Sequence, residues 1–564
     1  MIKTKIAIFD FTGCQGCEFN LLSLNETLLD FSQDFEITNW RLLQKEKSQD
    51  FDIAFIEGAI TTEEQIKLLK KIRETAKILV ALGACAITGN VFSGLTPEKR
   101  KKLAQKIYAS NYKLKAKFLE PVSKFVKVDE NIPGCPAEIE KIKEFLKKIK
   151  KQKITSKIKT VSPPEYLAKI EGHGTLKVNF RLKKVDFEVE ESERLVEGLV
   201  LGKSYYQAPF INARICGICP VAHSLCSWKA IEDALGIIVS PETILLRKIL
   251  LASQIIKSHL LHLFFLVLPH YAGLTSSLKL SQRYPAEFHL MLNIKRITDQ
   301  IALAVGGEML FSANITLGGF LKIPSQEELF SIKNNIWQVI DEAQDLIKLF
   351  AGFQPPEIEV KHRWLTIHPN AEYPLYQGKV NKENFLKEKV NPHSPVKLAF
   401  WQNKPVKVGA LSRINLFSNR LNLKTQAIIS HLNLKFPSFN PFHNNLAQAI
   451  EILHFLEEII NLIDALSQKD LNKAKGEEIM PVPQKEVSGE AVLEAPRGVL
   501  FHQITITPEG KIKNYNIVTP TLLNLTSLPQ EAKELIKKTE TPTKIETIEA
   551  LIRAFDPCIT CAVH

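Results

Sequence analysis

The stretch Arg214-Ile-Cys216-Gly-Ile-Cys219-Pro-Val-Ala-His223 decides how this chain folds, because a similar stretch occurs far away in the sequence. The second stretch is residues 556–564, Asp556-Pro-Cys558-Ile-Thr-Cys561-Ala-Val-His564. Each stretch contains a Cys-x-x-Cys pair, and each pair places two soft sulfur ligands within reach of one metal. A site built from four thiolates at opposite ends of such a long segment exists only once the segment is folded. We therefore expect the fold to bring these two stretches together.

A structural zinc site with four cysteine ligands is the simplest interpretation of two such pairs. Two features of the sequence argue against it. The pairs of a structural zinc site usually lie closer together, whereas more than three hundred residues separate Cys219 from Cys558. His223 follows Cys219 by four residues, so on a helix its imidazole could donate a hydrogen bond to that sulfur, which a structural zinc does not require.

The two motifs resemble the signature motifs of the nickel-iron hydrogenase large subunit, and the flanking runs SWKAIEDALGI and LIRAF fit the same family. The resemblance implies that the first cysteine of each pair, Cys216 and Cys558, is a terminal nickel ligand. It implies that the second, Cys219 and Cys561, bridges nickel to iron. It also implies that the iron carries carbon monoxide and cyanide, which maturation proteins supply.

The length and composition of the chain indicate a large globular protein. At 564 residues it is long enough for about three to four average domains or two large ones, and 45% of its residues are apolar. The most apolar stretch, His259–His270, is shorter than the roughly twenty residues that a membrane span needs. The start, Met1–Phe11, has the pattern of a strand and no cleavage signal. We expect a cytoplasmic protein without a membrane span.

The nine cysteines and the net charge of +12 narrow the possible functions. In a cytoplasmic chain, cysteines indicate metal or redox ligands rather than disulfides, and an odd number cannot pair completely. The positive charge is concentrated in a lysine-dense region from about Lys99 to Lys159. These lysines form no nucleic-acid-binding motif and are not interleaved with aromatic residues, so a solvated face is favoured over a nucleic-acid site. An acidic electron-transfer partner is a further interpretation.

Residues 1–150 alternate short apolar strands with amphipathic helices, a pattern typical of an open α/β fold with a parallel sheet. We expect a flavodoxin-like domain there, whose ligands bind beyond the carboxyl ends of the strands. The expected elements are strands Lys5–Phe11, Asp52–Ile56 and Lys77–Leu82 and helices Leu21–Leu29 and Glu63–Ile72.

Four cysteines lie where this binding edge is expected. Cys14 and Cys17 follow the first strand, Cys85 follows the third, and Cys135 lies in the turn Pro133-Gly-Cys-Pro136. Taken alone, Cys14-Gln-Gly-Cys17 fits a thioredoxin-like dithiol or half of a zinc site equally well. The motifs Cys-x-x-Cys, Gly-x-Cys and Pro-Gly-Cys-Pro, in this order, resemble the nickel-iron hydrogenase small subunit. The four thiolates of that subunit hold one four-iron four-sulfur cluster.

The small-subunit resemblance ends near residue 150. A lysine-rich linker, residues 151–164, leads into residues 165–564, which contain the large-subunit motifs. Four cysteines belong to the first region and four to the signature pairs, so only Cys226 remains, and we interpret it as an ordinary buried thiol. No Met lies between Met1 and Met291 to start the second region separately. We therefore expect a fusion of two subunits that are usually separate.

A further motif, Lys169-Ile-Glu171-Gly-His173, resembles the large-subunit motif Arg-x-Glu-Gly-His, with Lys169 in place of the arginine. The resemblance implies that Glu171 passes protons from the nickel-bound thiolate toward solvent. A carboxylate can do so if its surroundings bring its pKa near the working pH. The simpler alternative is an ordinary surface acid.

The run Arg194-Leu-Val-Glu197 resembles a segment whose glutamate binds a magnesium ion together with the histidine of the C-terminal motif. The resemblance therefore implies a magnesium site at Glu197 and His564. The simpler alternative is an exposed helical ion pair between Arg194 and Glu197.

The run Glu494-Ala-Pro-Arg497-Gly498 resembles a family motif whose arginine lies over the open metal coordination site. Dihydrogen is apolar and weakly acidic, so its cleavage requires a metal that accepts hydride and an adjacent base that takes the proton. A fixed cation beside the metal orients that base and stabilises the separating charge. The resemblance assigns the cation to Arg497 and the proton-accepting thiolate to Cys558.

The remainder of residues 165–564 is expected to be a mainly helical α+β scaffold. Strands and proline-rich loops are expected from about residue 355 to 420, where Val408-Gly-Ala-Leu-Ser-Arg413 resembles a family segment of unassigned role. Apolar residues at helical spacing predict long helices over Thr243–Leu266, Ala286–Val305, Gln326–Phe350 and Leu446–Ser467.

The resemblance covers most of the chain and is closest to the cytoplasmic, cofactor-coupled hydrogenases. It implies reversible oxidation of dihydrogen, with electrons leaving one at a time through the Cys14 cluster to a soluble acceptor or partner protein. A dihydrogen sensor with little turnover is the alternative, whereas quinone-reducing respiratory relatives lack the nickel cysteines kept here. The sequence does not name the electron acceptor, the catalytic direction, the oxygen tolerance or the oligomeric state, nor does it say whether the C-terminus is processed or encoded at His564.

Overall fold

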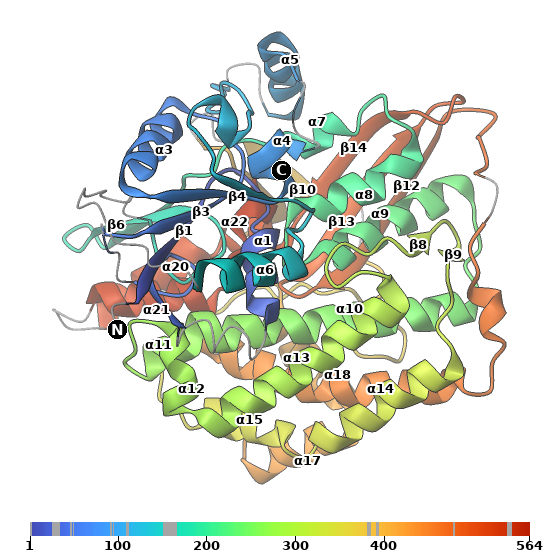
Figure 1. Ribbon diagram of the computed structural model, residues 1–564. Helices are drawn as coiled ribbons and strands as arrows, with labels where there is room; N and C mark the ends of the chain where they lie inside the picture. Colours follow the sequence, from blue (N-terminus) through green and yellow to red (C-terminus); the bar gives the residue numbers. More distant parts are fainter. Residues whose placement is uncertain are drawn as a thin grey trace.

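A computed structural model of the protein describes residues 3–24, 34–45, 48, 50–90, 93, 95–108, 112–150, 166–380, 385–390, 394–477, 480–538 and 544–563. The expected linker, residues 151–164, and His564 lie outside the described residues. Figure 1 shows the N-terminal sheet, in blue, beside a larger region of long helices and a second sheet.

Five strands in the described N-terminal residues form a parallel sheet in the order β2-β1-β3-β4-β5. This is the flavodoxin-like strand order, so the predicted fold of this region is confirmed. The sequence pattern did not indicate β2 or β5. Polar residues in β2 interrupt the apolar pattern of a strand, and β5 is only three residues long. The strands are β1 (Thr4–Asp10), β2 (Phe35–Trp40), β3 (Ile53–Glu57), β4 (Ile78–Leu82) and β5 (Glu130–Ile132).

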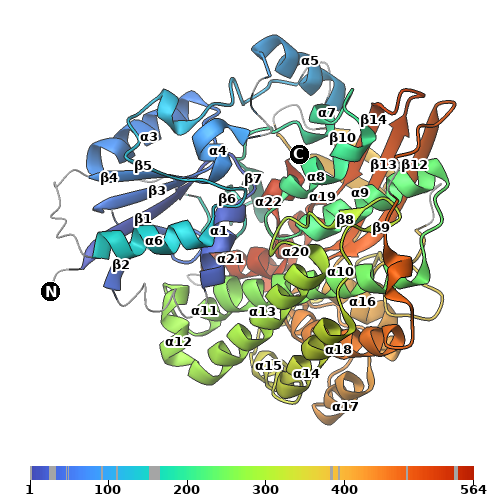
Figure 2. The same cartoon turned by 45° about the vertical axis from the view of Figure 1, so that its right-hand side comes forward.

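Helices cover both faces of this sheet, with α3 (Glu63–Thr75) and α6 (Ile139–Lys150) on opposite sides (Figure 2). Successive strand residues therefore contribute to two different apolar clusters. The cluster beneath α6 continues into the helices of the second region, from Phe55 to Trp228 and Leu250. The two regions consequently share one core.

The helix after β1 differs from the predicted Leu21–Leu29. Helix α1 runs from Gly16 to Leu21 and continues as a single 3-10 turn, Leu22–Leu24, while residues 25–29 lie outside the described residues. The helix begins early because Gln15, with a left-handed φ of 55°, turns the chain immediately after Cys14. Cys17 consequently lies in the first turn of α1.

Long helices form the base of the second region, largely as predicted. The predicted helix Gln326–Phe350 is two helices, separated by a turn over residues 340–342. The helices are α9 (Pro220–Leu235), α10 (Pro241–Leu261), α13 (Pro285–Gly306), α14 (Gln326–Val339), α15 (Ala343–Ala351) and α18 (Asn444–Leu466).

Helix α10 is the central helix of this base and packs against α9, α13 and α18. A π-helical turn, His262–Val267, and α11 (Leu268–Tyr271) extend it. The continuous run Pro241–Tyr271 is long and apolar enough to cross a membrane, but 94% of its most apolar window is buried inside the protein. Such burial is typical of the core helix of a globular protein.

An antiparallel sheet of β12 (Val487–Ala495), β13 (Gly498–Ile506) and β14 (Ile512–Val518) packs against α9. The hairpin between β12 and β13 closes at the pair Ala495–Gly498, so the turn between these two residues presents Arg497. Gly489 lets β12 approach α9 closely, since a Cβ there would lie 2.2 Å from the backbone nitrogen of Ala234.

The C-terminal residues return to the middle of the molecule (Figures 1 and 2). After α21 (Lys544–Ala554), the chain forms a parallel bridge between Cys558 and Glu171 and then the short helix α22 (Ile559–Ala562). Gly172, whose φ is 75°, allows the two backbones of this bridge to approach each other, because a Cβ there would lie 2.4 Å from Cβ of Ile559. The C-terminal segment is therefore held in the interior by the bridge between the backbones of Cys558 and Glu171.

The two regions meet most closely at two glycines. The Gly217 amide donates a 2.7 Å hydrogen bond to the Cys14 carbonyl, and a Cβ on Gly217 would lie 2.4 Å from Cα of Gly16. Backbone atoms on the opposing side cannot swing away as a flexible side chain can.

We expect Gly217→Ala to destabilise the protein by about 1–3 kcal/mol, because the added methyl group forces this backbone contact apart. Gly352→Ala is the matched control, since its Cβ would meet nothing closer than 3.4 Å. Thermal unfolding of both variants checks the prediction. Equal midpoints for the two variants would contradict it.

Candidate metal centre

Cys216, Cys219, Cys558 and Cys561 form one compact, buried group. The Cys216 and Cys558 sulfurs lie 3.1 Å apart, and the Cys219 and Cys561 sulfurs lie 3.3 Å apart. Within the described part of the chain, this is the only group of three or more potential ligands whose ligand atoms all lie within 4.8 Å of one another. The predicted convergence of the two motifs is therefore what the fold produces.

Two helix N-termini present these four sulfurs. Cys219 is the N-cap of α9 and Cys558 the N-cap of α22, so each Cys-x-x-Cys pair lies at a helix start. Burial raises the pKa of Cys558 and Cys561 well above that of a free thiol. A bound cation is what deprotonates such thiols. Four soft donors of this kind fit nickel and iron, and equally fit zinc on chemistry alone.

Glu171 lies beside this group and is fully buried, so the alternative of a surface acid is wrong. Its carboxylate accepts hydrogen bonds from the Thr560 amide, at 3.0 Å, and from the Thr560 hydroxyl. Burial and the negative charge of Cys216 raise the pKa of Glu171 to about 8, although the contacts from Thr560 oppose the shift. A carboxyl group with such a pKa can take up and release a proton near neutral pH.

Arg497 is also buried, and its guanidinium is held at one side only. Nε donates to the Asp556 carbonyl and Nη2 to the Asp556 carboxylate, both at 2.6 Å. Its Nη1 is buried and has no hydrogen-bond partner among the described residues. A buried donor without a partner is costly, so this atom fits a site that a ligand at the cysteine group completes.

A second buried arginine, Arg413, holds the turn that carries Arg497. It forms ion pairs with Glu451 and Glu494 and donates to the carbonyls of Ala495 and Pro496. The sequence indicated only that the segment containing Arg413 resembles the family. Its role was missed because its partners lie 38 to 83 residues away.

Arg194 joins the two cysteine motifs through their backbones. Its guanidinium donates to the carbonyls of Arg214 and Ile215, at 2.9 and 2.6 Å, and to the carbonyl of Thr560, at 2.6 Å. Arg194 and Glu197 are both buried, so the alternative of an exposed ion pair between them is wrong.

Glu197 contacts the Ile517 amide at 2.8 Å and the Lys397 ammonium at 2.5 Å. The ammonium balances the carboxylate charge in this buried position. Because His564 lies outside the described residues, the predicted magnesium site at Glu197 and His564 stays a prediction.

The other four cysteines gather at the carboxyl edge of the parallel sheet. The Cys17 sulfur accepts the Ala137 amide at 3.4 Å and lies 2.3 Å from where a Cβ on Gly83 would be. Asn90 Nδ2 lies 3.6 Å from the Cys85 sulfur and 3.3 Å from that of Cys135.

Among the described residues, these four cysteines are not one of the groups compact enough to hold a single ion. An iron-sulfur cluster does not need such a compact group, since it holds several metals rather than one ion. The glycine next to the Cys17 sulfur leaves room that a side chain would fill. Cys14 and Cys17 are buried, whereas Cys85 and Cys135 are partly exposed. The thiolate donor set therefore fits the predicted four-iron four-sulfur cluster.

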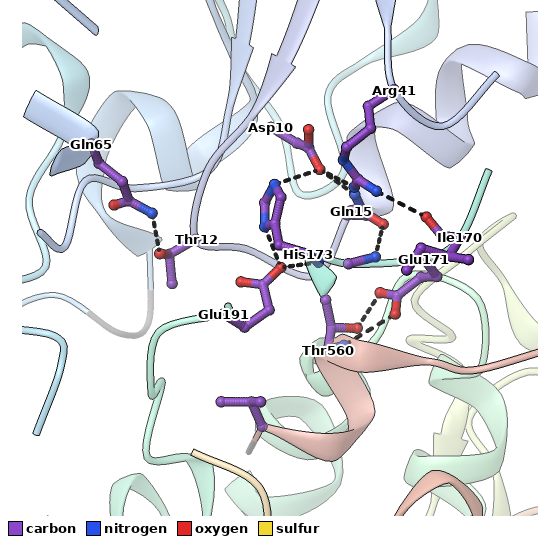
Figure 3. A network of polar contacts seen from close by, with 12 residues as sticks. Asp10, Thr12, Gln15, Arg41, Gln65, Ile170, Glu171, His173, Glu191 and Thr560 are labelled. Atoms are coloured by element: carbon purple, nitrogen blue, oxygen red, sulfur yellow. Dashed lines mark hydrogen bonds and ion pairs between the residues drawn. The ribbon is translucent and has the colours of Figure 1, made fainter. Parts of the chain in front are cut away.

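Figure 3 shows the polar network between residues 11–15, which we call the cluster loop, and residues 170–173. Gln15 accepts the Gly172 amide at 2.8 Å and donates to Asp10 at 2.5 Å. Asp10 also pairs with Arg41 and with His173. Burial lowers the pKa of His173, but the carboxylates of Asp10 and Glu191 outweigh it and hold that pKa at about 10. The network thus fastens Glu171 to the cluster loop.

Comparison with known proteins supports the same two-part organisation. Residues 14–149 match the family model described as NADH ubiquinone oxidoreductase, 20 Kd subunit. Residues 194–302 and 339–564, together more than half of the chain, match the model described as nickel-dependent hydrogenase.

Individual relatives match each part separately. Sulfhydrogenase 1 subunit alpha of Pyrococcus furiosus is 31% identical over 419 residues, which are 71% of this chain and 97% of that protein. Sulfhydrogenase 2 subunit delta of the same organism is 35% identical over 145 residues, 25% of this chain and 60% of that protein. The NAD-reducing hydrogenase HoxS subunit beta of Cupriavidus necator is 27% identical over 466 residues, 71% of this chain and 94% of that protein.

Solved structures share the fold of the second part. An NAD+-reducing [NiFe]-hydrogenase in the H2-reduced state has a TM-score of 0.62 at 23% identity, covering 71% of this chain and 98% of that one. The Ni-Fe-Se hydrogenase of Desulfomicrobium baculatum has a TM-score of 0.58 at 20% identity, covering 70% and 98%. The family models and the relatives show, together with the buried four-cysteine centre, that the chain belongs to the nickel-dependent hydrogenase family. It is a nickel-iron hydrogenase in which a small-subunit-like region is fused to the large subunit.

Proposed function

We propose that the protein oxidises dihydrogen reversibly at a nickel-iron centre held by Cys216, Cys219, Cys558 and Cys561, each dihydrogen yielding two protons and two electrons. Family membership supports the reaction. The observation that carries the proposal is the buried cysteine group with the unpartnered Nη1 of Arg497, within the described residues. Carbon monoxide and cyanide on the iron, inserted by maturation proteins, are part of the proposal.

The protein residues in this proposal move and stabilise charge. When bound, the metals supply the Lewis acidity that makes dihydrogen acidic enough to lose a proton to a neighbouring base. The Cys558 thiolate is that base, and the fixed guanidinium of Arg497 stabilises the charge that separates. Glu171, paired with Cys558 through the backbone, receives the proton next and passes it toward solvent.

Electrons leave through a single four-iron four-sulfur cluster on Cys14, Cys17, Cys85 and Cys135. The hydrogen bond from the Gly217 amide to the Cys14 carbonyl supports a short route between the two centres. The partly exposed Cys85 and Cys135 support an exit on their side of the cluster. The acceptor in this proposal is a soluble acceptor or a partner protein, which a relative named for NAD reduction supports. The proposed location is the cytoplasm.

Glu197 and His564 complete the proposal as ligands of a magnesium ion. The buried position of Glu197 supports this role, because it lies three residues after Arg194, whose guanidinium donates to the Thr560 carbonyl in the C-terminal motif.

Metal analysis and dihydrogen-dependent dye reduction of protein matured in its native host test the proposed function together. We expect nickel and iron in equal amounts at the centre, and rapid dye reduction. A dihydrogen sensor would contain the same metals and reduce the dye slowly. Zinc without nickel would overturn the proposal.

Cys558→Ser is expected to lose nickel and all dihydrogen oxidation, because a serine hydroxyl is a poor ligand for a soft metal site. Cys226→Ser is the matched control, since Cys226 is equally buried but donates to the carbonyls of Ala491 and Leu500 outside the site. Elemental analysis of both variants measures the outcome. Full nickel content in Cys558→Ser would refute the assignment.

Glu171→Gln is expected to slow dihydrogen oxidation and hydrogen-deuterium exchange by about 10²–10⁴-fold, because an amide cannot relay the proton. Nickel content stays normal, since glutamine can still accept the Thr560 amide. Glu190→Gln is the control, since Glu190 is a partly exposed acid that pairs with Lys115 outside the site. An exchange rate unchanged in Glu171→Gln would exclude Glu171 from the proton route.

A further inference from the structure

A series of buried hydrogen bonds leads from the Cys561 sulfur into the antiparallel sheet. The sulfur lies 3.6 Å from His223 Nε2, and His223 Nδ1 lies 3.3 Å from His502 Nε2. His502 Nδ1 lies 2.9 Å from the Tyr515 hydroxyl. His223 is on α9, His502 on β13 and Tyr515 on β14, so three elements contribute one ring each.

The series continues from Tyr515 through Ser227 to the side-chain amide nitrogen of Asn212. The Tyr515 hydroxyl lies 2.7 Å from Ser227 Oγ, which is one helical turn after His223 on α9. Asn212 Nδ2, from α8 (Ala208–Asn212), donates to Ser227 Oγ at 3.2 Å. All of these side chains are buried. We call this set the Cys561 relay: Cys561, His223, His502, Tyr515, Ser227 and Asn212.

The Cys561 end determines the direction of the hydrogen bonds in this series when both imidazoles are neutral, and the Asn212 end is compatible with that direction. A cysteine that binds metal is a thiolate, so the Cys561 sulfur can only accept. The amide nitrogen of Asn212 can only donate. Starting from the sulfur, His223 Nε2–H donates to Cys561, so neutral His223 accepts at Nδ1 from His502 Nε2–H. Neutral His502 then accepts at Nδ1 from the Tyr515 hydroxyl, and Tyr515, having given its one proton, accepts from Ser227.

The same reasoning assigns the protons of both imidazoles. A neutral imidazole has one N–H donor and one acceptor nitrogen. His502 accepts from Tyr515 at Nδ1, so its proton is on Nε2 and is donated to His223 Nδ1. His223 then carries its proton on Nε2, facing Cys561. Burial raises the pKa of Tyr515, which keeps its hydroxyl protonated and able to donate.

We propose that His502 and Tyr515 are positioning residues that fix the tautomer of His223, so that its Nε2–H donates to the Cys561 sulfur and draws electron density from the metal centre. The inference rests on the proposed function, because it concerns the electronic state of the proposed centre. Hydrogen bonds to ligand sulfur tune a metal site in this way, and the partner on the other imidazole nitrogen sets the tautomer. Aligned hydrogen bonds in a buried series strengthen one another.

The test is the infrared spectrum of the carbon monoxide and cyanide ligands on iron, recorded on Tyr515→Phe holoenzyme matured in the native host. Without the phenol, His502 Nδ1 is no longer held as an acceptor, and His223 is released from its tautomer. The Cys561 sulfur then donates more electron density, so we expect the carbon monoxide band to move to lower wavenumber while nickel content is unchanged.

Tyr205→Phe is the matched control, because Tyr205 is buried and donates to the Pro481 carbonyl at 2.8 Å, outside the Cys561 relay. Its bands should coincide with those of the unchanged protein. His502→Leu, which removes the donor to His223 directly, should shift the band in the same direction as Tyr515→Phe.

Bands unmoved in both Tyr515→Phe and His502→Leu would overturn the inference and leave the proposed function intact. The absence of carbon monoxide and cyanide bands from the unchanged protein would instead overturn the proposed function, and the inference with it.

Discussion

The metal centre depends on the hydrogen bonds that the guanidinium of Arg194 donates. This guanidinium lies in a buried position and donates to backbone carbonyls of both cysteine motifs, Ile215 in one and Thr560 in the other. A buried charge is stable only where hydrogen bonds replace its water, so the carbonyls hold the guanidinium and the guanidinium holds the carbonyls together. By joining the backbones of the two motifs, Arg194 brings the sulfurs of Cys216 and Cys558 into contact.

The charged side chains around the centre are fixed in the same way, by buried partners distant in sequence. Arg413 shapes the turn that carries Arg497, and Asp556 holds two of the Arg497 nitrogens. Glu171 is held by Thr560 on one side and, through Gly172, by Gln15 of the cluster loop on the other. The proton and electron routes that we propose therefore begin at neighbouring points of the backbone.

Several elements could be predicted from local pattern, and several could not. Strands β1, β3 and β4 and helices α10, α13 and α18 were predicted because their apolar periodicity is strong. Strand β5 was missed because three residues carry too little pattern. The predicted helix over Gln326–Phe350 was too long, because the apolar face continues across the break between α14 and α15.

The sequence by itself determined the chemistry that the chain can offer: two Cys-x-x-Cys pairs, a third cysteine set after parallel strands, the carboxyl group of Glu171 and the guanidinium of Arg497. Only the tertiary structure decided that Arg194 clamps both motifs, that Arg413 positions Arg497, and that His502 and Tyr515 lie behind His223. The reason is physical. Ligand type and spacing are local properties of the chain, whereas the partner of a buried polar group is whichever group the packing of distant elements places within hydrogen-bond distance.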